Sequence, residues 1–443
     1  MPSLTLRGNL SHEIFNNTKK FATALSRPQQ GNIREMLNGL LIGSESHLNH
    51  LGRAGGAIAT ERKTIERFSR TLQKLPVDVM KQVHMNSLAS EFKDEAVLLL
   101  SDGGDFQKPH AKKMEGVCGS VDGSNGHRMG WGYPAYGLMA LGVETGKLRP
   151  LALHIYSTRE EEFKSAWNEQ KKEMELLQSF IHSSAKDRII VEDRGCDDEK
   201  RFLHFLGMDI SFVTRVHAGT KSRKVLIQKD KNDYDCISIH DLGEKLKGTA
   251  GAQRQWYNKK LKKTLTSKIV YQKVFLEGHT NVPLYAIFCY SEGFTEPLVI
   301  LTDLTTKSTE AAWKHFFYYK KRWEVENFYR AIKQEFGAEK FLILKLSKIK
   351  ALLFLIMLAY CLLMKIKDKA MEMFGLVYTV FQHFCKGTQR SGSHHLDILA
   401  FIRLSLRPCL HEKAYRFYAV NLRRWLILKP LNQLSLFDNR KKW

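Results

Sequence analysis

The sequence predicts an α/β protein in which a β-rich insertion interrupts the core and helical regions flank it. Between 116 and 216, short β-branched runs alternate with amphipathic helical stretches, a pattern typical of a packed sheet and helices. Residues 217–296 instead hold short strand runs between polar and basic turns. Helical periodicity dominates elsewhere. We therefore expect a helical N-terminal region at 1–115, the second part of the core at 297–365, and a helical C-terminal region at 366–443.

The N-terminal region is expected to contain three short helices. Ser26 precedes the first, glycines follow the second, and the third runs from about Thr60 to Leu72. Short helices joined by a glycine-bearing turn fit a helix-turn-helix module that binds DNA. A small helical cap is the alternative. The basic residues of the third helix that we expect to contact the major groove or phosphates are Arg62, Lys63 and Arg67.

The first part of the core has an informative order of elements. Strands are predicted up to Asp122, at 135–143, at 148–156, up to Asp193 and at 210–216, with helices at 161–181 and 199–206. The order β-β-β-α-β-α-β is that of a ribonuclease H-like core. Its centre would place Asp122 and Asp193 on neighbouring strands. Each of these aspartates follows an apolar run and has a glycine close behind it.

The second part of the core follows the insertion. The run Leu298–Asp303 predicts a strand that rejoins the core, and a helix is expected at 310–336. An apolar helix at 349–366 should pack beneath it. Its most apolar part, Ala351–Met364, is about 14 residues long, which favours a buried helix over a membrane span.

The helix expected at 310–336 carries four residues with the spacing Y-x2-R-x3-E-x6-K, namely Tyr319, Arg322, Glu326 and Lys333. At about 100° per residue they fall on one helical face, and Arg330 joins them. One carboxylate among cations and a phenol suits a metal-binding acid beside a phosphate backbone. The alternative is a solvated, salt-bridged helix face.

These motifs resemble those of bacterial insertion-sequence DDE transposases with the Y-x2-R-x3-E-x6-K signature, which are cut-and-paste enzymes. Asp122 after its strand and Asp193 within Asp-Arg-Gly match the two upstream acidic motifs of that group. The resemblance extends over roughly 25–365. It implies a ribonuclease H-like core with a β-strand insertion and an enzyme that binds terminal inverted repeats, hydrolyses phosphodiester bonds and transfers strands.

The resemblance also implies the roles of the site residues. Two Mg²⁺ ions, for which Mn²⁺ substitutes, would lie about 3.5–4 Å apart. Asp122 would bridge them, and Asp193 and Glu326 would each complete one site. Three carboxylates supply the hard oxygen ligands that these ions prefer. The phosphate backbone would be held by Tyr319, Arg322, Arg330 and Lys333.

Other acidic residues compete for these positions. Asp197 and Asp198 lie near Asp193, but we expect them to cap the next helix. Glu192 should point to the opposite face of the strand from Asp193. Glu324 lies on a different helical face from Glu326.

An aromatic and basic segment within the insertion is a second candidate for DNA contact. Trp256 is expected to stack on a flipped base, as insertion-domain aromatics do in related enzymes with hairpin intermediates. A structural aromatic is the alternative. Lys259 and Lys260 follow it and are expected to contact the DNA backbone.

Composition favours a polyanionic partner. The chain has 69 basic and 46 acidic residues, a net charge of +23 over 443 residues. The cysteines form no CxxC pair, which disfavours a zinc site and favours reduced thiols. No apolar signal core opens the sequence, so we expect a cytoplasmic, nucleoid-associated bacterial protein with no membrane partner.

Double-stranded DNA, as transposon ends and target, is the expected partner. Concerted cutting of two ends calls for two active sites, so we expect a homodimer on paired ends. Two other functions stay open: a catalytically silent, transposase-derived DNA-binding protein, and a stand-alone structure-specific nuclease. The intact acidic set favours the enzyme.

The tail carries one more motif. Gln433, Leu434, Leu436 and Phe437 match the pentapeptide with which bacterial proteins bind the replicative sliding clamp. Two apolar side chains would fill a pocket while the glutamine bonds at its rim. An apolar tail segment packed on the last helix is the alternative.

Overall fold

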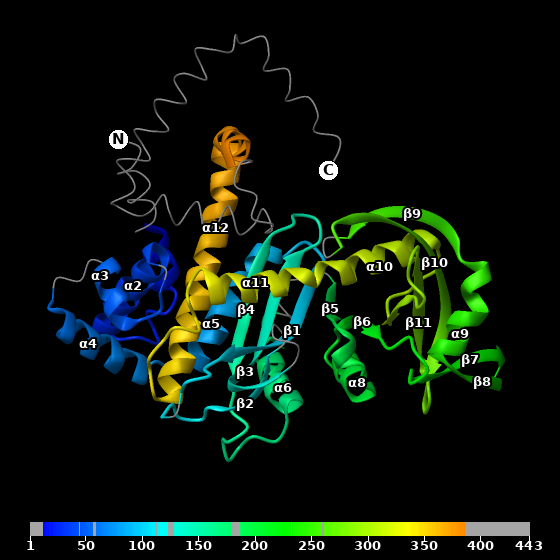
Figure 1. Cartoon of the computed structure of the whole chain (residues 1–443), viewed down its shortest axis with the longest axis horizontal. Helices are drawn as coiled ribbons and strands as arrows, with labels where there is room; N and C mark the ends of the chain where they lie inside the picture. The colour runs from blue at the N-terminus through cyan, green and yellow to red at the C-terminus, as the bar shows by residue number, and fades with distance from the viewer. Residues whose placement is uncertain are drawn as a thin grey trace, which may run out of the picture.

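A single mixed sheet of twelve strands runs through the computed structural model, in the order β2-β3-β1-β5-β6-β12-β11-β10-β7-β8, with β4 on β3 and β9 on β10. Figure 1 shows helices packed along it. The structure describes residues 12–43, 45–55, 59–111, 113–122, 128–178, 180, 187–231, 233–258 and 261–385. Side chains at 55, 121–122, 128–129, 252 and 369–385 are not described.

The core half of the sheet confirms the expected alternation of strands and helices. Its elements are β1 (Val97–Gln107), β2 (Cys118–Asp122), β3 (Arg128–Gly142), β4 (Leu148–Ile155), α6 (Ala166–Leu176), β5 (Arg188–Glu192), α8 (Glu199–Gly207) and β6 (Ser211–Val216). β1 pairs antiparallel with β3 and parallel with β5, and β5 pairs parallel with β6. The centre of the core is therefore β1.

The strand β1 corrects the predicted boundary of the N-terminal region. The expected helical segment 1–115 contains this central strand, in which Val97–Leu100 are fully buried. An uninterrupted apolar run of this kind is typical of a strand covered on both faces. The strand β2, which was expected at the centre, instead pairs only with the far end of β3 among the described strands.

Before β1 the chain is helical as predicted. The helices are α2 (Arg27–Ile42), α3 (Leu48–Gly55), α4 (Glu61–Gln73) and α5 (Val77–Ala89). Ser26 and Gln29 form a capping box that fixes the start of α2. The three helices α2, α3 and α4 pack on one another, and α2 and α4 also pack on α12 (Leu346–Cys385). This agrees with a helical module but does not test DNA binding.

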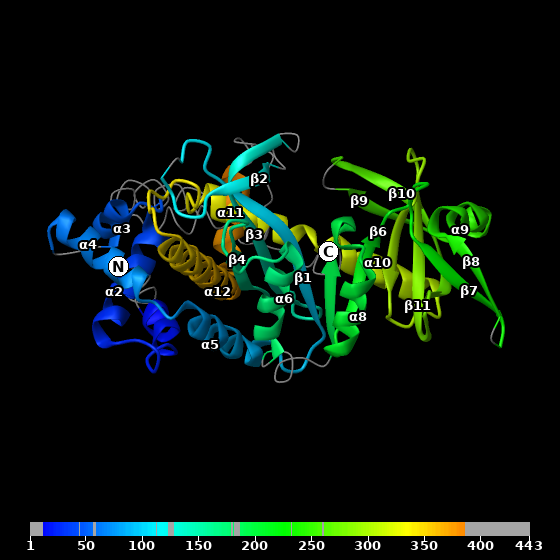
Figure 2. The same cartoon turned by 90° about the horizontal axis from the view of Figure 1, so that it is seen from below.

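The insertion continues the core sheet. It comprises β7 (Lys224–Asp230), β8 (Asp233–Ser238), α9 (Ile239–Leu246), β9 (Gly251–Asn258), β10 (Lys263–Leu276) and β11 (His279–Ser291). The strand β12 (Leu298–Thr302) then pairs with both β11 and β6, so the predicted return to the core is confirmed. In Figure 2 this β-rich part lies at one end of the molecule and the N-terminal helices at the other.

Two helices after β12 cover one face of the sheet. These are α10 (Thr309–Lys321) and α11 (Trp323–Gln334), which meet at Arg322, so the single predicted helix at 310–336 is two. At the junction the N–H groups of Arg322 and Val325 bond to carbonyls three residues earlier, and the helix tightens there.

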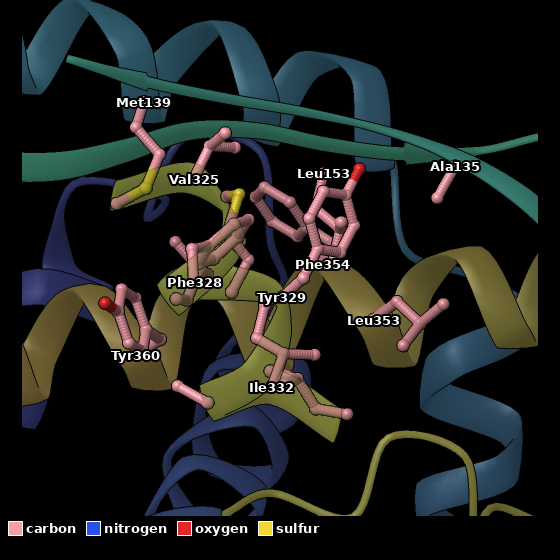
Figure 3. Packing of buried hydrophobic residues seen from close by; sticks show 14 of the residues in the cluster. Ala135, Met139, Leu153, Val325, Phe328, Tyr329, Ile332, Leu353, Phe354 and Tyr360 are labelled. Carbon is pink, nitrogen blue, oxygen red and sulfur yellow. The ribbon is translucent and has the colours of Figure 1, made fainter. Parts of the chain in front are cut away.

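The apolar helix α12 packs beneath α11. Side chains of both helices meet β3 and β4, as Phe328, Tyr329, Phe354, Met139 and Leu153 show in Figure 3. The segment Leu346–Asp368 is long and apolar enough to cross a membrane, but 83% of its most apolar window is buried in the protein, as in a core helix.

Candidate active site

The candidate active site lies beneath α11, just beyond the last paired residues of the parallel strands β1 and β5. The last paired residues are Leu100 of β1 and Val191 of β5. Asp102 follows Leu100 by two residues, and Asp193 follows Val191 by two residues, so the two aspartates lie side by side. Carboxyl ends of adjacent parallel strands are the usual place for functional groups in such sheets. Asp193 starts a short 3-10 turn, and its side chain accepts the N–H of Arg194.

The helix α11 brings Glu326 over the same place. Tyr329, three residues further on, lies over two glycines of the sheet: a Cβ at Gly104 would be 2.6 Å from its ring, and one at Gly137 would be 2.9 Å from its hydroxyl. The phenol donates to the carbonyl of Asp102 at 3.2 Å. Because these glycines have no side chain, α11 approaches β1 and β3 closely enough for Glu326 to share a partner with Asp102.

That partner is the guanidinium of Arg322. Its Nη1 lies 2.5 Å from Asp102, and its Nη2 lies 2.6 Å from Glu326 and 3.3 Å from Asp193. The arginine side chain is 9% exposed, whereas the three carboxylates are 25–35% exposed. Three acidic side chains from β1, from the end of β5 and from α11 thus converge on one buried cation.

Electrostatics differ among these carboxylates. Burial raises the pKa of Asp102 to about 6; Arg322 opposes this rise, and the charges of Glu326 and Asp193 add to it. Burial alone would also raise the pKa of Asp193, but Arg322, the Arg194 N–H and the Tyr319 hydroxyl lower it below its usual value. One guanidinium therefore does not offset the negative charge of all three groups.

Tyr319 belongs to this cluster through Asp193. Its hydroxyl donates to Asp193 Oδ1 at 3.0 Å, so in this structure the phenol positions a carboxylate, where a phosphate contact was predicted. Burial and the charge of Asp193 raise the pKa of Tyr319 to about 12, which keeps the donor protonated. Arg215 of β6 lies 3.7 Å from the same carboxylate.

The comparison with protein families identifies the chain. The family model described as Transposase DDE domain matches residues 102–362, more than half of the 443 residues. The chain belongs to the DDE transposase domain family. The match begins at Asp102, on the strand that the geometry singles out.

Other comparisons of this DDE transposase add less. No curated protein matches it. Among solved structures, a cryo-EM structure of the piggyBac transposase synaptic complex with hairpin DNA aligns with a TM-score of 0.41 and 10% identity, over 94% of this chain and 82% of that chain. A similarity this distant carries no weight for function.

The structure places the backbone of Asp122 away from the cluster around Arg322. That backbone pairs with Arg128, whereas Asp102 pairs with Gly137, nine residues away along β3. At about 3.3 Å per residue that separation is up to roughly 30 Å along the strand. The prediction that Asp122 and Asp193 lie on neighbouring strands is wrong, because β5 lies between β1 and β6.

The competing acids lie outside the cluster. Glu192 points to the other face of β5, where it pairs with Arg201 and accepts from Ser101, as predicted from strand alternation. Asp198 caps α8 as expected, whereas Asp197 pairs with Arg223. On α11, Glu324 accepts from Asn327.

Lys333 lies on α11 but pairs with other acids. Its ammonium is 3.2 Å from Glu339 and 3.6 Å from Asp105, and neither residue contacts Arg322 in the described hydrogen bonds. Arg330 is partly buried on the same helix. The four signature residues therefore divide into a cluster of three around Asp102 and Asp193, and one lysine beside a second acidic pair.

A cavity of about 310 Å³ adjoins the site on the insertion side. Trp256 lines it together with the cationic residues Arg194, Arg215 and Lys320. The indole packs edge-on against Phe316, and Lys320 lies 4.3 Å from its ring centroid. Its N–H donates to Ser267 at 2.9 Å. Trp256 is therefore packed as a structural aromatic, the alternative given above, but it also lines the cavity.

The remaining predicted contact residues are less informative. On α4, Arg62 pairs with Glu66 and Arg67 with Glu35, and Lys63 is exposed. Lys259 and Lys260 lie outside the described residues, as do the tail residues Gln433, Leu434, Leu436 and Phe437.

Asp102 is the site residue that sequence reasoning missed. Its signal was present: four apolar residues, Val97–Leu100, come before Ser101 and Asp102, whereas the run before Asp122 is interrupted by both glycine and serine. The stronger run marks the buried central strand, and the weaker one marks a strand at the edge of the core.

Proposed function

We propose that this DDE transposase belongs to the Y-x2-R-x3-E-x6-K group and acts on an insertion sequence. It would bind the terminal inverted repeats, cut at the element ends and join them to target DNA. The observation that carries this proposal is the convergence of Asp102, Asp193 and Glu326 on Arg322 within the domain that the family model matches.

The three carboxylates fit a divalent-metal site in their donor chemistry. All are partly exposed oxygen ligands, the kind that Mg²⁺ and Mn²⁺ prefer. Within the described residues no three acidic, histidine or cysteine side chains are arranged to share an ion, and at these carboxylates the guanidinium of Arg322 lies among the oxygens. In this proposal Asp102 takes the role predicted for Asp122, with Asp193 and Glu326 completing the set.

Two bound ions would activate the attacking oxygen and neutralise the leaving oxygen of the phosphodiester. The chain's own residues prepare the site. Tyr319 holds Asp193 in place by a hydrogen bond, and Tyr329 fixes the height of α11 above β1. Arg322, with its planar fork, is the side chain best suited to a DNA phosphate at the site.

The cavity beside the site supports a proposed contact with an unpaired base. An aromatic wall at Trp256 and cations at Arg194, Arg215 and Lys320 suit a nucleotide, whose base stacks while its phosphate pairs with the cations. Further DNA contact is proposed for Arg330 and Lys333 on α11 and for Arg62, Lys63 and Arg67 in the N-terminal helices.

Assembly and regulation stay proposals drawn from sequence. We propose a homodimer on paired DNA ends in the bacterial cytoplasm, and sliding-clamp binding through the tail. A silent DNA-binding descendant or a stand-alone nuclease would share the fold, but a protein without catalysis has no use for three converging carboxylates.

The test is cleavage of a supercoiled plasmid that carries the element ends, in Mg²⁺. Asp102→Asn, Asp193→Asn and Glu326→Gln should each reduce cutting by at least about a thousandfold while end binding persists, because many phosphate contacts share the affinity. The matched control is Asp122→Asn, which should retain cutting. Loss of cutting in Asp122→Asn with normal cutting in Asp102→Asn would restore the assignment made from sequence and reject this one.

Binding without cutting by the unaltered protein would favour the silent DNA-binding protein. Cutting without joining, and without preference for the ends, would favour the nuclease.

A further inference from the structure

We propose that Arg322 is the internal counterion of the metal-free site, and that it must leave the carboxylates before divalent ions bind. This inference rests on the proposed function, because it takes Asp102, Asp193 and Glu326 as the metal-binding set. It adds a coupling between metal binding and DNA binding through one side chain.

The geometry is that of a cation enclosed by its partners. The two terminal nitrogens of Arg322 reach one carboxylate oxygen on each of Asp102, Asp193 and Glu326, at 2.5, 3.3 and 2.6 Å. The arginine is more buried than any of them. The guanidinium thus lies between carboxylate oxygens from three separate elements. A metal ion shared by these oxygens would need the same space.

Charge makes this arrangement incompatible with divalent ions on the same carboxylates. Three carboxylates face the guanidinium of Arg322, and among the described residues only Asp193 has a second cation, Arg215 at 3.7 Å, so negative charge remains in excess and the cluster attracts further cations. Divalent ions bound to the same oxygens would repel Arg322 at close range. The arginine then needs another anion, and a DNA phosphate offers a match to its planar fork.

The local backbone suits such an exchange. Arg322 lies at the junction between α10 and α11, outside both helices, so its side chain can change direction without breaking either. Asp193 keeps Arg215 and the Tyr319 hydroxyl as partners when Arg322 leaves. Because coupling between two ligands is reciprocal, metal should tighten DNA binding through Arg322 as DNA tightens metal binding.

The experiment measures Mn²⁺ binding by calorimetry in the full-length protein without DNA. Arg322→Gln should bind Mn²⁺ on the order of tenfold more tightly than the unaltered protein, the usual size of a coupling between sites. Lys321→Gln is the matched control, because it removes the same charge from the exposed neighbouring residue. This control should bind Mn²⁺ as the unaltered protein does, within about twofold.

Thermal unfolding gives a second readout. In EDTA, Arg322→Gln should unfold at a lower temperature than Lys321→Gln, because three carboxylates then face one another without their shared counterion. Saturating Mn²⁺ should raise the unfolding temperature of Arg322→Gln more than that of the control. If Arg322→Gln does not fold, Arg322→Lys retains a charge but not the fork, and it should gain Mn²⁺ affinity in the same direction by less.

A double variant distinguishes failure of this inference from failure of the proposed function. If Asp102→Asn abolishes Mn²⁺ binding but Arg322→Gln and Lys321→Gln bind equally, the counterion role is wrong and the metal set stands. If Arg322→Gln binds Mn²⁺ equally with and without Asp102→Asn, the metal set itself is wrong.

Discussion

Two clusters of charged side chains lie on opposite faces of the same sheet, and they differ in charge balance and exposure. Around Arg322, three carboxylates that are 25–35% exposed share one cation. On the other face His154 of β4 lies between Glu169 and Glu173 of α6 at 2.9 and 3.0 Å, and Lys81 of α5 pairs with Glu173.

The second cluster is more deeply buried, and in it Lys81 and His154 face two carboxylates. Burial opposes the charged form of His154, but hydrogen bonds from both ring nitrogens to Glu169 and Glu173 raise its pKa. Lys81, Glu173 and Glu169 are 3–7% exposed. A buried cluster in which the charges are paired stabilises one packing arrangement. A partly exposed cluster with excess charge can bind ligands of the opposite charge.

The largest effect should come from breaking the second cluster. Lys81→Met leaves the Glu173 carboxylate buried with one partner fewer, and should lower the free energy of unfolding by about 3–5 kcal/mol. The double variant Lys81→Met with Glu173→Leu removes both partners and should regain most of the lost free energy of unfolding. Urea unfolding measures both, and a loss below about 1 kcal/mol in the single variant would mean that this cluster is not structural.

A smaller loss is expected where the sheet meets α11. Gly104→Ala would place a methyl group 2.6 Å from the Tyr329 ring and should cost about 1–3 kcal/mol and reduce cutting. Gly103→Ala, one residue earlier, meets nothing within 4 Å and serves as the control. Equal stability and equal cutting in the two variants would show that close approach of α11 does not position the site.

The pH dependence of unfolding should report the second cluster next. Hydrogen bonds and ion pairs lower the pKa of Glu169 and Glu173 to about 2, so their contribution is present above about pH 4.5 and is lost as pH falls towards 2. The pKa of His154 is raised, so its contribution is complete below about pH 6.5 and is lost as pH rises through the raised value. In urea unfolding, His154→Gln should not show the loss of stability at higher pH. An unchanged pH profile would show that a charged His154 does not contribute to stability.

The smallest effect is expected at the site itself. Glu326→Gln removes one of three mutually repelling carboxylates and one partner of Arg322, so the two changes oppose each other. In metal-free buffer the free energy of unfolding should change by less than about 1 kcal/mol, although cutting is lost. A loss as large as that of Lys81→Met would remove the distinction between the two clusters.

Local sequence by itself determined most of the elements and two of the three acids. Strand and helix periods located β3 to β6, the insertion strands β8, β10 and β11, and α2 to α4, because each period depends on neighbouring residues alone; β7 and β9 were not predicted. The spacing of Tyr319, Arg322 and Glu326 correctly anticipated that these side chains lie together. Asp193 was identified because an apolar run ends just before it.

Tertiary structure decided which strand lies beside β5 and therefore which aspartate joins the site. Asp102 and Asp122 both follow apolar runs and precede glycine, and the stronger run before Asp102 does not by itself say which strand lies beside β5. The pairing of β1 with β5 joins residues about ninety positions apart, and only burial and register across the whole sheet select it. The direction of Arg322 was decided in the same way, since an arginine between two helices points to solvent or to acids according to what the rest of the fold places beside it.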